Sequence, residues 1–225
     1  ARTILEQLAV AEEEIRGHEN DPEGEVRLGL PGTISQILAV PLIVAVHLRY
    51  PKIKLRIADA MSGFVLEWMR DGRIDLAVLY GEAREHGIQT EPILDEPLHF
   101  FGQPDRAEMD LLPPPGSALP FARILRLPLI LPGDGHGLRE SVKRYALSLG
   151  LEVDTFIDVD SYSNIKSLVA EGLGYSVLPQ NAIAAEIRDG RLQSWRVTEP
   201  AMCRRVHLAH SVERPLTNAV RAVLE

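Results

Sequence analysis

The stretch Gly72-Arg73-Ile74-Asp75-Leu76-Ala77-Val78-Leu79 decides the fold class of this sequence. It ends in a nearly continuous apolar run, which is typical of a strand covered on both faces, as in a parallel sheet. Two segments with alternating apolar residues, 25–30 and 53–57, predict two earlier strands. Apolar residues at helical spacing fill the segments between these strands. The order strand, helix, strand, helix, strand predicts an α/β lobe with right-handed crossovers.

The second half of the chain repeats the pattern of strand, polar turn and helix. Residues 88–102 are predicted to form an extended crossing with a break at Asp95 and Glu96, and residues 104–120 a loop or short helix. The expected elements are strands at 127–131, 153–159, 175–178, 195–197 and 206–209, and helices at 138–149, 165–171, 182–188 and 215–224. Two such lobes in one chain predict a ligand site at their interface.

Charge and cysteine content exclude some functions. The chain has 225 residues, a formal net charge of −8 and a pI of about 5.4, so this segment should bind nucleic acid poorly. Cys203 is its single cysteine, which excludes a disulfide within the chain and favours a reducing compartment. No apolar run approaches the roughly 20 residues of a membrane span, and no signal peptide is evident.

No catalytic, cofactor or metal motif stands out, so we expect neither an enzyme nor a bound cofactor. Nucleophile-elbow, zinc-protease, phosphate-loop and dinucleotide fingerprints are all missing. Cys203, His207 and His210 suggest zinc at first sight. A strand through 206–209 would point the two histidines to opposite faces, and three ligands on two faces argue against a metal site.

The first residues predict a helix with a seam on one side. The seam residues follow one another at alternating spacings of three and four: Ala1, Ile4, Leu8, Ala11 and Ile15. One interpretation of residues 1–20 is the tail of a longer dimerisation helix whose start is missing, since a helix this short is marginal alone. The other is a surface helix packed on the domain.

Three motifs in this order resemble the effector-binding domain of LysR-type transcriptional regulators. They are the strand, turn and proline-containing helix from Val26 to Pro41, "Tyr50-Pro51" followed by the stretch quoted first, and "Leu168-Val169-Ala170-Glu171-Gly172-Leu173-Gly174-Tyr175-Ser176-Val177-Leu178-Pro179". Within that family, "Leu30-Pro31-Gly32-Thr33-Ile34-Ser35" and "Ala77-Val78-Leu79-Tyr80-Gly81" resemble the nitrogen-assimilation-control branch.

The resemblance implies a fold like that of type 2 periplasmic-binding proteins, with two Rossmann-like lobes joined by two crossover strands. It places lobe I at 24–97 plus 206–225 and lobe II at 98–205. It also implies a cytoplasmic homodimer or homotetramer. DNA would be read by a winged helix-turn-helix that precedes Ala1 in the whole protein.

Topology and resemblance together nominate a set of effector-binding residues. In open α/β sheets, ligands bind beyond the carboxyl ends of the strands. The nominated residues lie in the turns at those ends and are Thr33, Ser35, Ser62, Gly133, His136, Ser161 and Asn164. Hydroxyls and free N–H groups at a helix start suit a small anionic effector. Several have a simpler alternative: helix capping by one of Thr33 and Ser35, capping or solvent exposure for His136, and capping by Ser161 or Ser163.

The favoured function is therefore an effector-sensing module that shifts between closure states when its ligand binds. The alternative is a solute-binding protein of a transport system, which has the same fold. An enzyme on this fold is a third class, for which the sequence offers no catalytic constellation.

Overall fold

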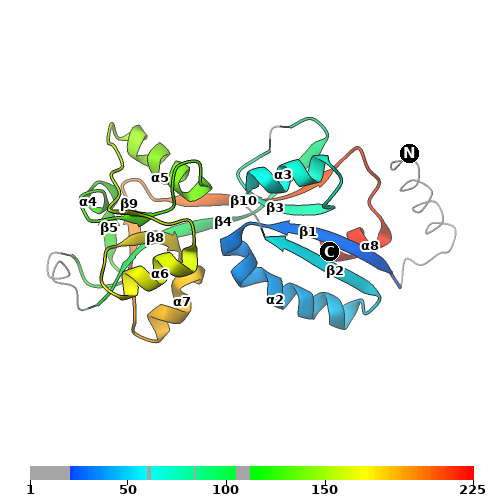
Figure 1. Ribbon diagram of the computed structural model, residues 1–225, viewed down its shortest axis with the longest axis horizontal. Helices are drawn as coiled ribbons and strands as arrows, with labels where there is room; N and C mark the ends of the chain where they lie inside the picture. Colours follow the sequence, from blue (N-terminus) through cyan, green and yellow to red (C-terminus); the bar gives the residue numbers. More distant parts are fainter. Residues whose placement is uncertain (1–20, 60–61, 84, 105–111) are drawn as a thin grey trace. The chain divides into compact units, whose positions relative to one another are not determined.

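The computed structural model describes residues 21–59, 62–83, 85–104 and 112–225 (Figure 1). The chain divides into two compact units. Unit 1 comprises Ala1–Leu94 and Arg205–Glu225, and unit 2 comprises Asp95–Arg204. The predicted lobe boundaries lay three residues later at the first crossing and one residue later at the second. The predicted dimerisation helix, residues 1–20, lies outside the described residues.

Unit 1 is built on a sheet in which the predicted parallel strands are confirmed. Its strands are β1 (Gly24–Leu30), β2 (Ile53–Asp59), β3 (Leu76–Tyr80) and part of β10 (Cys203–Ser211). The order is β2-β1-β3-β10, with β1 parallel to both neighbours and β10 antiparallel to β3. Because β1 lies between β2 and β3 and is parallel to both, the carboxyl ends of these three strands lie at one edge of the sheet.

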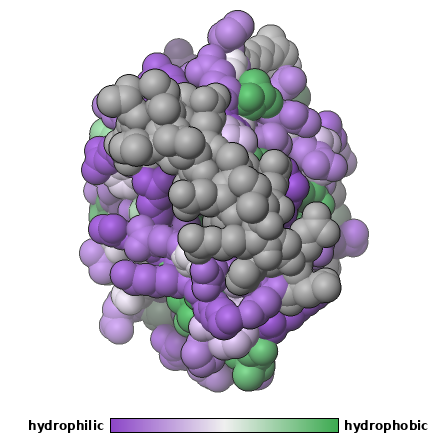
Figure 2. All heavy atoms as spheres, turned by 90° about the vertical axis from the view of Figure 1, so that its right-hand side faces the viewer, coloured by the Kyte–Doolittle hydropathy of each residue, from purple (hydrophilic) through white to green (hydrophobic). Residues whose placement is uncertain are grey.

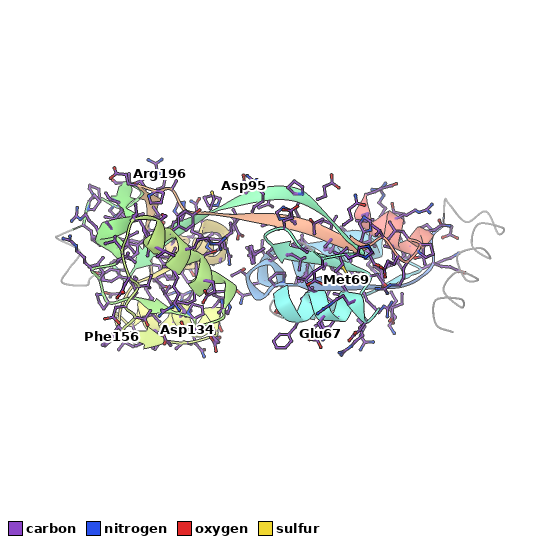
Figure 3. The ribbon with its side chains drawn as sticks, turned by 90° about the horizontal axis from the view of Figure 1, so that it is seen from above. Glu67, Met69, Asp95, Asp134, Phe156 and Arg196 are labelled. Carbon is purple, nitrogen blue, oxygen red and sulfur yellow. The ribbon has the colours of Figure 1, made fainter. Side chains whose placement is uncertain are left out.

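Helices cover both faces of this sheet, as the apolar run in β3 predicted. The helices are α2 (Gly32–Arg49), α3 (Ser62–Arg70) and α8 (Asn218–Leu224). Val78 packs with the cores of α2 and α8, whereas Ala77 and Leu79 pack with the core under α3. Met69 points from α3 into that core, while Glu67 is exposed (Figure 3).

Asp75 joins the start of β3 to β1 through hydrogen bonds with Arg27. Its Oδ2 accepts from the backbone N–H of Arg27 at 2.9 Å and from Arg27 Nε at 3.0 Å. Its Oδ1 accepts from Arg27 Nη2 at 2.5 Å. Arg27 Nη1 also donates to the carbonyl of Gly72 at 2.9 Å. The carboxylate thus has a structural role in unit 1.

Unit 2 has its own sheet and core. Its strands are β4 (Ile88–Gly102, which begins in unit 1), β5 (Ala118–Pro120), β6 (Ile130–Leu131), β7 (Ile157–Asp158), β8 (Ser176–Pro179) and β9 (Gln193–Thr198). Its helices are α4 (Phe121–Ile124), α5 (Gly137–Ser148), α6 (Tyr162–Ala170) and α7 (Gln180–Arg188). β4 pairs with β8 and β9, β5 with β9, and β6 with β7.

Four expectations about strands and helices were wrong in detail. β4 runs through Asp95 and Glu96 without a break, because Glu96 is ion-paired with Arg204 and its charge does not force the chain outward. Residues 118–120, expected in a loop or short helix, form β5. The strand expected at 153–159 shrinks to β7, because β6 offers only two residues to pair with. The last helix begins at Asn218, where Thr217 supplies the cap.

Candidate functional site

The first nominated turn leads from β1 into α2 in unit 1. Pro31 is the N-cap of α2 and supplies no side-chain hydrogen bond, and the first turn of the helix contains no acidic residue. Ser35 N–H donates to the Pro31 carbonyl at 2.8 Å, whereas the earlier amides have no acceptor within the helix. N–H groups without a side-chain cap, at the positive end of an 18-residue helix, can donate hydrogen bonds to a bound anion.

Thr33 and Ser35 occupy different environments in this turn. Thr33 is fully buried, and its Oγ1 lies 2.5 Å from the hydroxyl of Tyr80. Ser35 is half-buried. Ser62 is the first residue of α3, and its side chain is outside the described part of the structure. Of the unit 1 residues nominated, Ser35 is therefore the hydroxyl with a described exposed surface.

Tyr80 was not among the nominated residues, although it lies at the carboxyl end of a parallel strand. It is the last residue of β3, at the same edge as the turn into α2, and it is half-buried. Its hydroxyl joins the end of β3 to the first turn of α2 through Thr33. An aromatic hydroxyl at the carboxyl end of a parallel strand was the available signal.

In unit 2, the nominated residues lie around two helix starts. His136 is the N-cap of α5, where its Nδ1 accepts from Leu138 N–H at 3.1 Å. Ser161 caps α6, where its Oγ accepts from Asn164 N–H at 3.4 Å. The capping alternatives are thus the observed ones for both residues. His136 also contacts the ring of Tyr162 edge-on, with 5.3 Å between centroids, which brings the two helix starts together.

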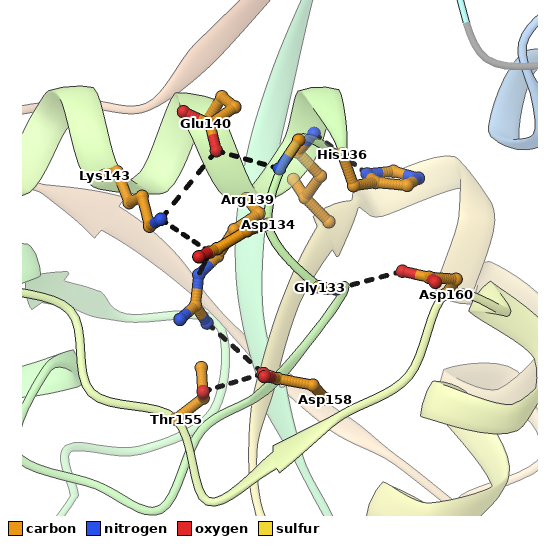
Figure 4. A network of polar contacts seen from close by, with 11 residues as sticks. Gly133, Asp134, His136, Arg139, Glu140, Lys143, Thr155, Asp158 and Asp160 are labelled. Atoms are coloured by element: carbon orange, nitrogen blue, oxygen red, sulfur yellow. Dashed lines mark hydrogen bonds and ion pairs between the residues drawn. The ribbon is translucent and has the colours of Figure 1, made fainter.

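Asp160 connects the same two turns and was not among the nominated residues. Its Oδ1 accepts from Gly133 N–H at 3.0 Å, so it links the turn before α5 to the residue just before the α6 cap (Figure 4). Gly133, His136, Ser161 and Asn164 therefore belong to one cluster within unit 2. That this cluster shares one ligand with the turn in unit 1 stays a prediction.

A buried arginine, Arg139, lies close to two carboxylates beside this cluster. Arg139 on α5 is 8% exposed, and its Nε and Nη1 lie 3.6 Å from carboxylate oxygens of Asp134 and Asp158, respectively. Lys143 Nζ donates to the same Asp134 oxygen at 2.5 Å. The separation of 3.6 Å is longer than a direct hydrogen bond, so the guanidinium acts through charge or bridging water.

The described residues contain no group of three or more His, Cys, Asp or Glu side chains that could hold a metal ion. His207 and His210 both lie in β10 and differ in environment: His207 is buried and His210 is half-buried. Cys203 is exposed at the start of the same strand.

The pKa of His136 predicts how unit 2 responds to acid. Burial lowers it below its usual value of about 6.5, Asp160 opposes this, and Arg204 adds to it. Burial and then Arg196 lower the pKa of His99 in the same way. Protonation of His136 would also remove the Nδ1 acceptor that caps α5. A pKa depressed by folding means that the unfolded chain binds the proton more tightly, so stability is complete above about pH 6.5 and falls below it.

We therefore expect the unfolding free energy of unit 2 to be lower at about pH 5.5 than at about pH 7.5. Urea denaturation followed by Trp195 fluorescence, in a Trp68→Phe background, measures it. His136→Asn should show a smaller drop, because asparagine caps a helix and does not titrate. Equal drops in the variant and the parent would contradict the assignment.

Comparison with known proteins places these features in a family. The sequence pattern of the family described as LysR substrate binding domain matches residues 19–225. The nitrogen assimilation regulatory protein nac of Klebsiella aerogenes is 27% identical over 228 residues, covering 100% of this chain and 72% of that protein.

Two solved structures share the fold at lower identity. The CcmR regulatory domain of Synechocystis PCC6803, in complex with 2-PG, has a TM-score of 0.78 at 22% identity and covers 90% of this chain and 94% of its own. The effector binding domain of QuiR, in complex with shikimate, has a TM-score of 0.76 at 16% identity with the same two coverages.

Proposed function

Because the chain belongs to the LysR substrate-binding domain family, a non-enzymatic family of regulator domains, we propose that it senses a small effector through the turns described above. The observation that carries the proposal is the start of α2, which has no side-chain cap from Pro31, no acidic residue in its first turn and the Thr33–Tyr80 hydroxyl pair beside it. This turn suits a carboxylate or phosphate oxyanion. The 2-PG and shikimate seen in two similar domains are small molecules with such a group.

Thermal unfolding with a panel of small carboxylate and phosphate metabolites tests this function. A ligand at a hundred times its dissociation constant should stabilise the domain by about 2.7 kcal/mol. Ser35→Ala should reduce the shift, because it removes the half-exposed hydroxyl at the α2 turn. Ser148→Ala, at the last residue of α5, is the matched control and should leave the shift unchanged. A panel in which no compound moves the unfolding temperature would argue against the proposal.

LysR-type regulators are cytoplasmic transcription factors, and we propose the same location here. The chain spans 72% of the nac regulator, so control of a DNA-binding domain in the whole protein is part of the proposal. Effector binding would act by favouring one of two closure states.

We further propose that a second copy of the chain covers α2. Among the described helices, α2 is the one long and apolar enough to cross a membrane by length and composition, yet it is the crossover between the adjacent parallel strands β1 and β2. Its outer face carries exposed apolar side chains: Ile37, Val40, Ile43, Val44 and Leu48. Among the coloured residues, Figure 2 shows mostly hydrophilic side chains on the face it presents. A stripe of this kind is typical of a protein–protein contact.

Val44→Asp should therefore convert a dimer to monomer, with a dissociation constant raised about a hundredfold or more, because it would bury an unpaired charge. Sedimentation equilibrium measures this change. Phe64→Asp introduces the same charge at a side chain that is 50% exposed on α3, over the opposite face of the sheet, and should leave the dimer intact. A monomeric parent chain, or equal effects of both variants, would contradict the α2 interface.

A further inference from the structure

The turn before α5 uses most of its amide donors internally. Gly133 N–H donates to Asp160 Oδ1 at 3.0 Å, and Gly135 N–H donates to Glu140 Oε1 at 3.2 Å. His136 N–H donates to the Gly133 carbonyl, and Leu138 N–H donates to the His136 ring. A turn of this glycine-rich kind can form an oxyanion site only with free N–H groups. Here two of its N–H groups, those of Gly133 and Gly135, already donate to carboxylates of the chain.

The charges around the turn disfavour an added anion. Figure 4 shows Arg139 and Lys143 paired with Asp134, Glu140 and Asp158, and a fourth carboxylate, Asp160, bonded to the Gly133 amide. This leaves a local excess of two negative charges. Lys143 donates to Asp134, and Arg139 lies 3.6 Å from carboxylate oxygens of Asp134 and Asp158 without a direct hydrogen bond to either. Burial disfavours the charged form of His136. An incoming oxyanion would meet repulsion and would have to displace a carboxylate that is part of the chain.

The second carboxylate oxygen of Asp160, Oδ2, is available to a ligand. Its side chain is exposed, and among the described residues its Oδ2 accepts no hydrogen bond. The hydroxyls of Ser161 and Ser163, 2.9 Å apart, follow directly in the chain. An ionised carboxylate only accepts hydrogen bonds, so the group that suits this position is an ammonium, hydroxyl or amide N–H.

We propose that Asp160 is a tethered carboxylate that occupies the oxyanion position of the turn 133–137, so that unit 2 rejects an effector oxyanion there and accepts a hydrogen-bond donor instead. The proposal rests on the proposed effector-sensing function and names the ligand chemistry of its unit 2 part. It leaves oxyanion binding to the start of α2, where Pro31 supplies no side-chain cap and acidic residues are absent from the first helical turn.

Titration of the full chain with sodium sulfate, followed by amide NMR signals, tests the proposal. In the parent chain the chemical shift of the Gly133 amide should not change as sulfate is added. In Asp160→Ala the released amide should shift saturably, with sulfate bound about tenfold or more tightly, the usual size of a charge-assisted hydrogen bond. Asp160→Asn keeps an acceptor for Gly133 without the charge, and should give an intermediate affinity.

Asp154→Ala is the matched control, because it removes the same charge from an exposed position in unit 2 that has no bond to the turn. Sulfate binding at Gly133 in the parent chain as tight as in Asp160→Ala would overturn the proposal. Equal behaviour of the Asp160→Ala and Asp154→Ala chains would do the same. If Asp160→Ala disturbs the fold, the sulfate affinity of Asp160→Asn is compared with that of the parent chain, and an equal affinity would overturn the proposal. Failure of the proposed function is distinguishable, because it would appear as a metabolite panel without any stabilising compound.

Discussion

Glu96→Ala should lower the unfolding free energy of unit 2 by about 3–5 kcal/mol, because it leaves a buried guanidinium without its carboxylate. Arg204 Nη2 donates to Glu96 Oε2 at 3.0 Å, and the side chains are 3% and 10% exposed. The pair lies where the chain enters and leaves unit 2, since the units divide after Leu94 and after Arg204. Urea denaturation with Trp195 as reporter, in the Trp68→Phe background, measures the loss.

The double variant Glu96→Leu with Arg204→Met is the control for this result. Replacing a buried ion pair by apolar residues of similar volume is often close to neutral. We expect the double variant to recover most of the stability that the single variant loses. A double variant as unstable as Glu96→Ala would show that something other than the stranded charge causes the loss. A single variant that loses less than about 1 kcal/mol would place the pair in the class of exposed ion pairs.

The confirmed parts of the fold were those with a strong periodic signal. The apolar run of β3 and the alternation in β1 and β2 predicted a parallel sheet, and the structure has one. The errors fall on short strands and on charged positions. β6 and β7 hold two residues each, which is too short for a period to show. Glu96 looked like a break because its partner, Arg204, is 108 residues away in the sequence.

The sequence predicted that nominated residues lie at helix starts, and it did not predict their hydrogen-bond partners. Topology correctly put Thr33 and Ser161 at helix starts. It could not show that Thr33 is buried against Tyr80, since that contact joins residues 47 positions apart. It also could not show that Asp160 accepts a hydrogen bond from the Gly133 N–H, because an exposed aspartate in a polar turn has no sequence signature of its own. Hydrogen-bond partners across loops are properties of the folded chain.

Gly174→Ala should destabilise unit 2 by about 3 kcal/mol, at the upper end for an overpacked position. Gly174 belongs to the motif that resembles the family, and a Cβ placed there would lie 2.6 Å from the Pro128 carbonyl oxygen and 2.9 Å from Ile130 Cγ1. The backbone cannot move aside easily. Tyr175 N–H donates to that same carbonyl at 2.9 Å, and Ile130 N–H donates to the Tyr175 carbonyl at 2.8 Å.

Gly172→Ala, two residues earlier in the same motif, separates this steric reason from a conformational one. Gly172 has φ of 76°, which is unfavourable for alanine, but its nearest neighbour would be Gln103 Oε1 at an ordinary 3.6 Å. The left-handed conformation alone should cost about 1–2 kcal/mol. Denaturation of both variants should therefore rank Gly174→Ala as the more destabilised. The reverse order would mean that the strand edge around Pro128 yields, and that the left-handed conformation at Gly172 is the stronger constraint in this motif.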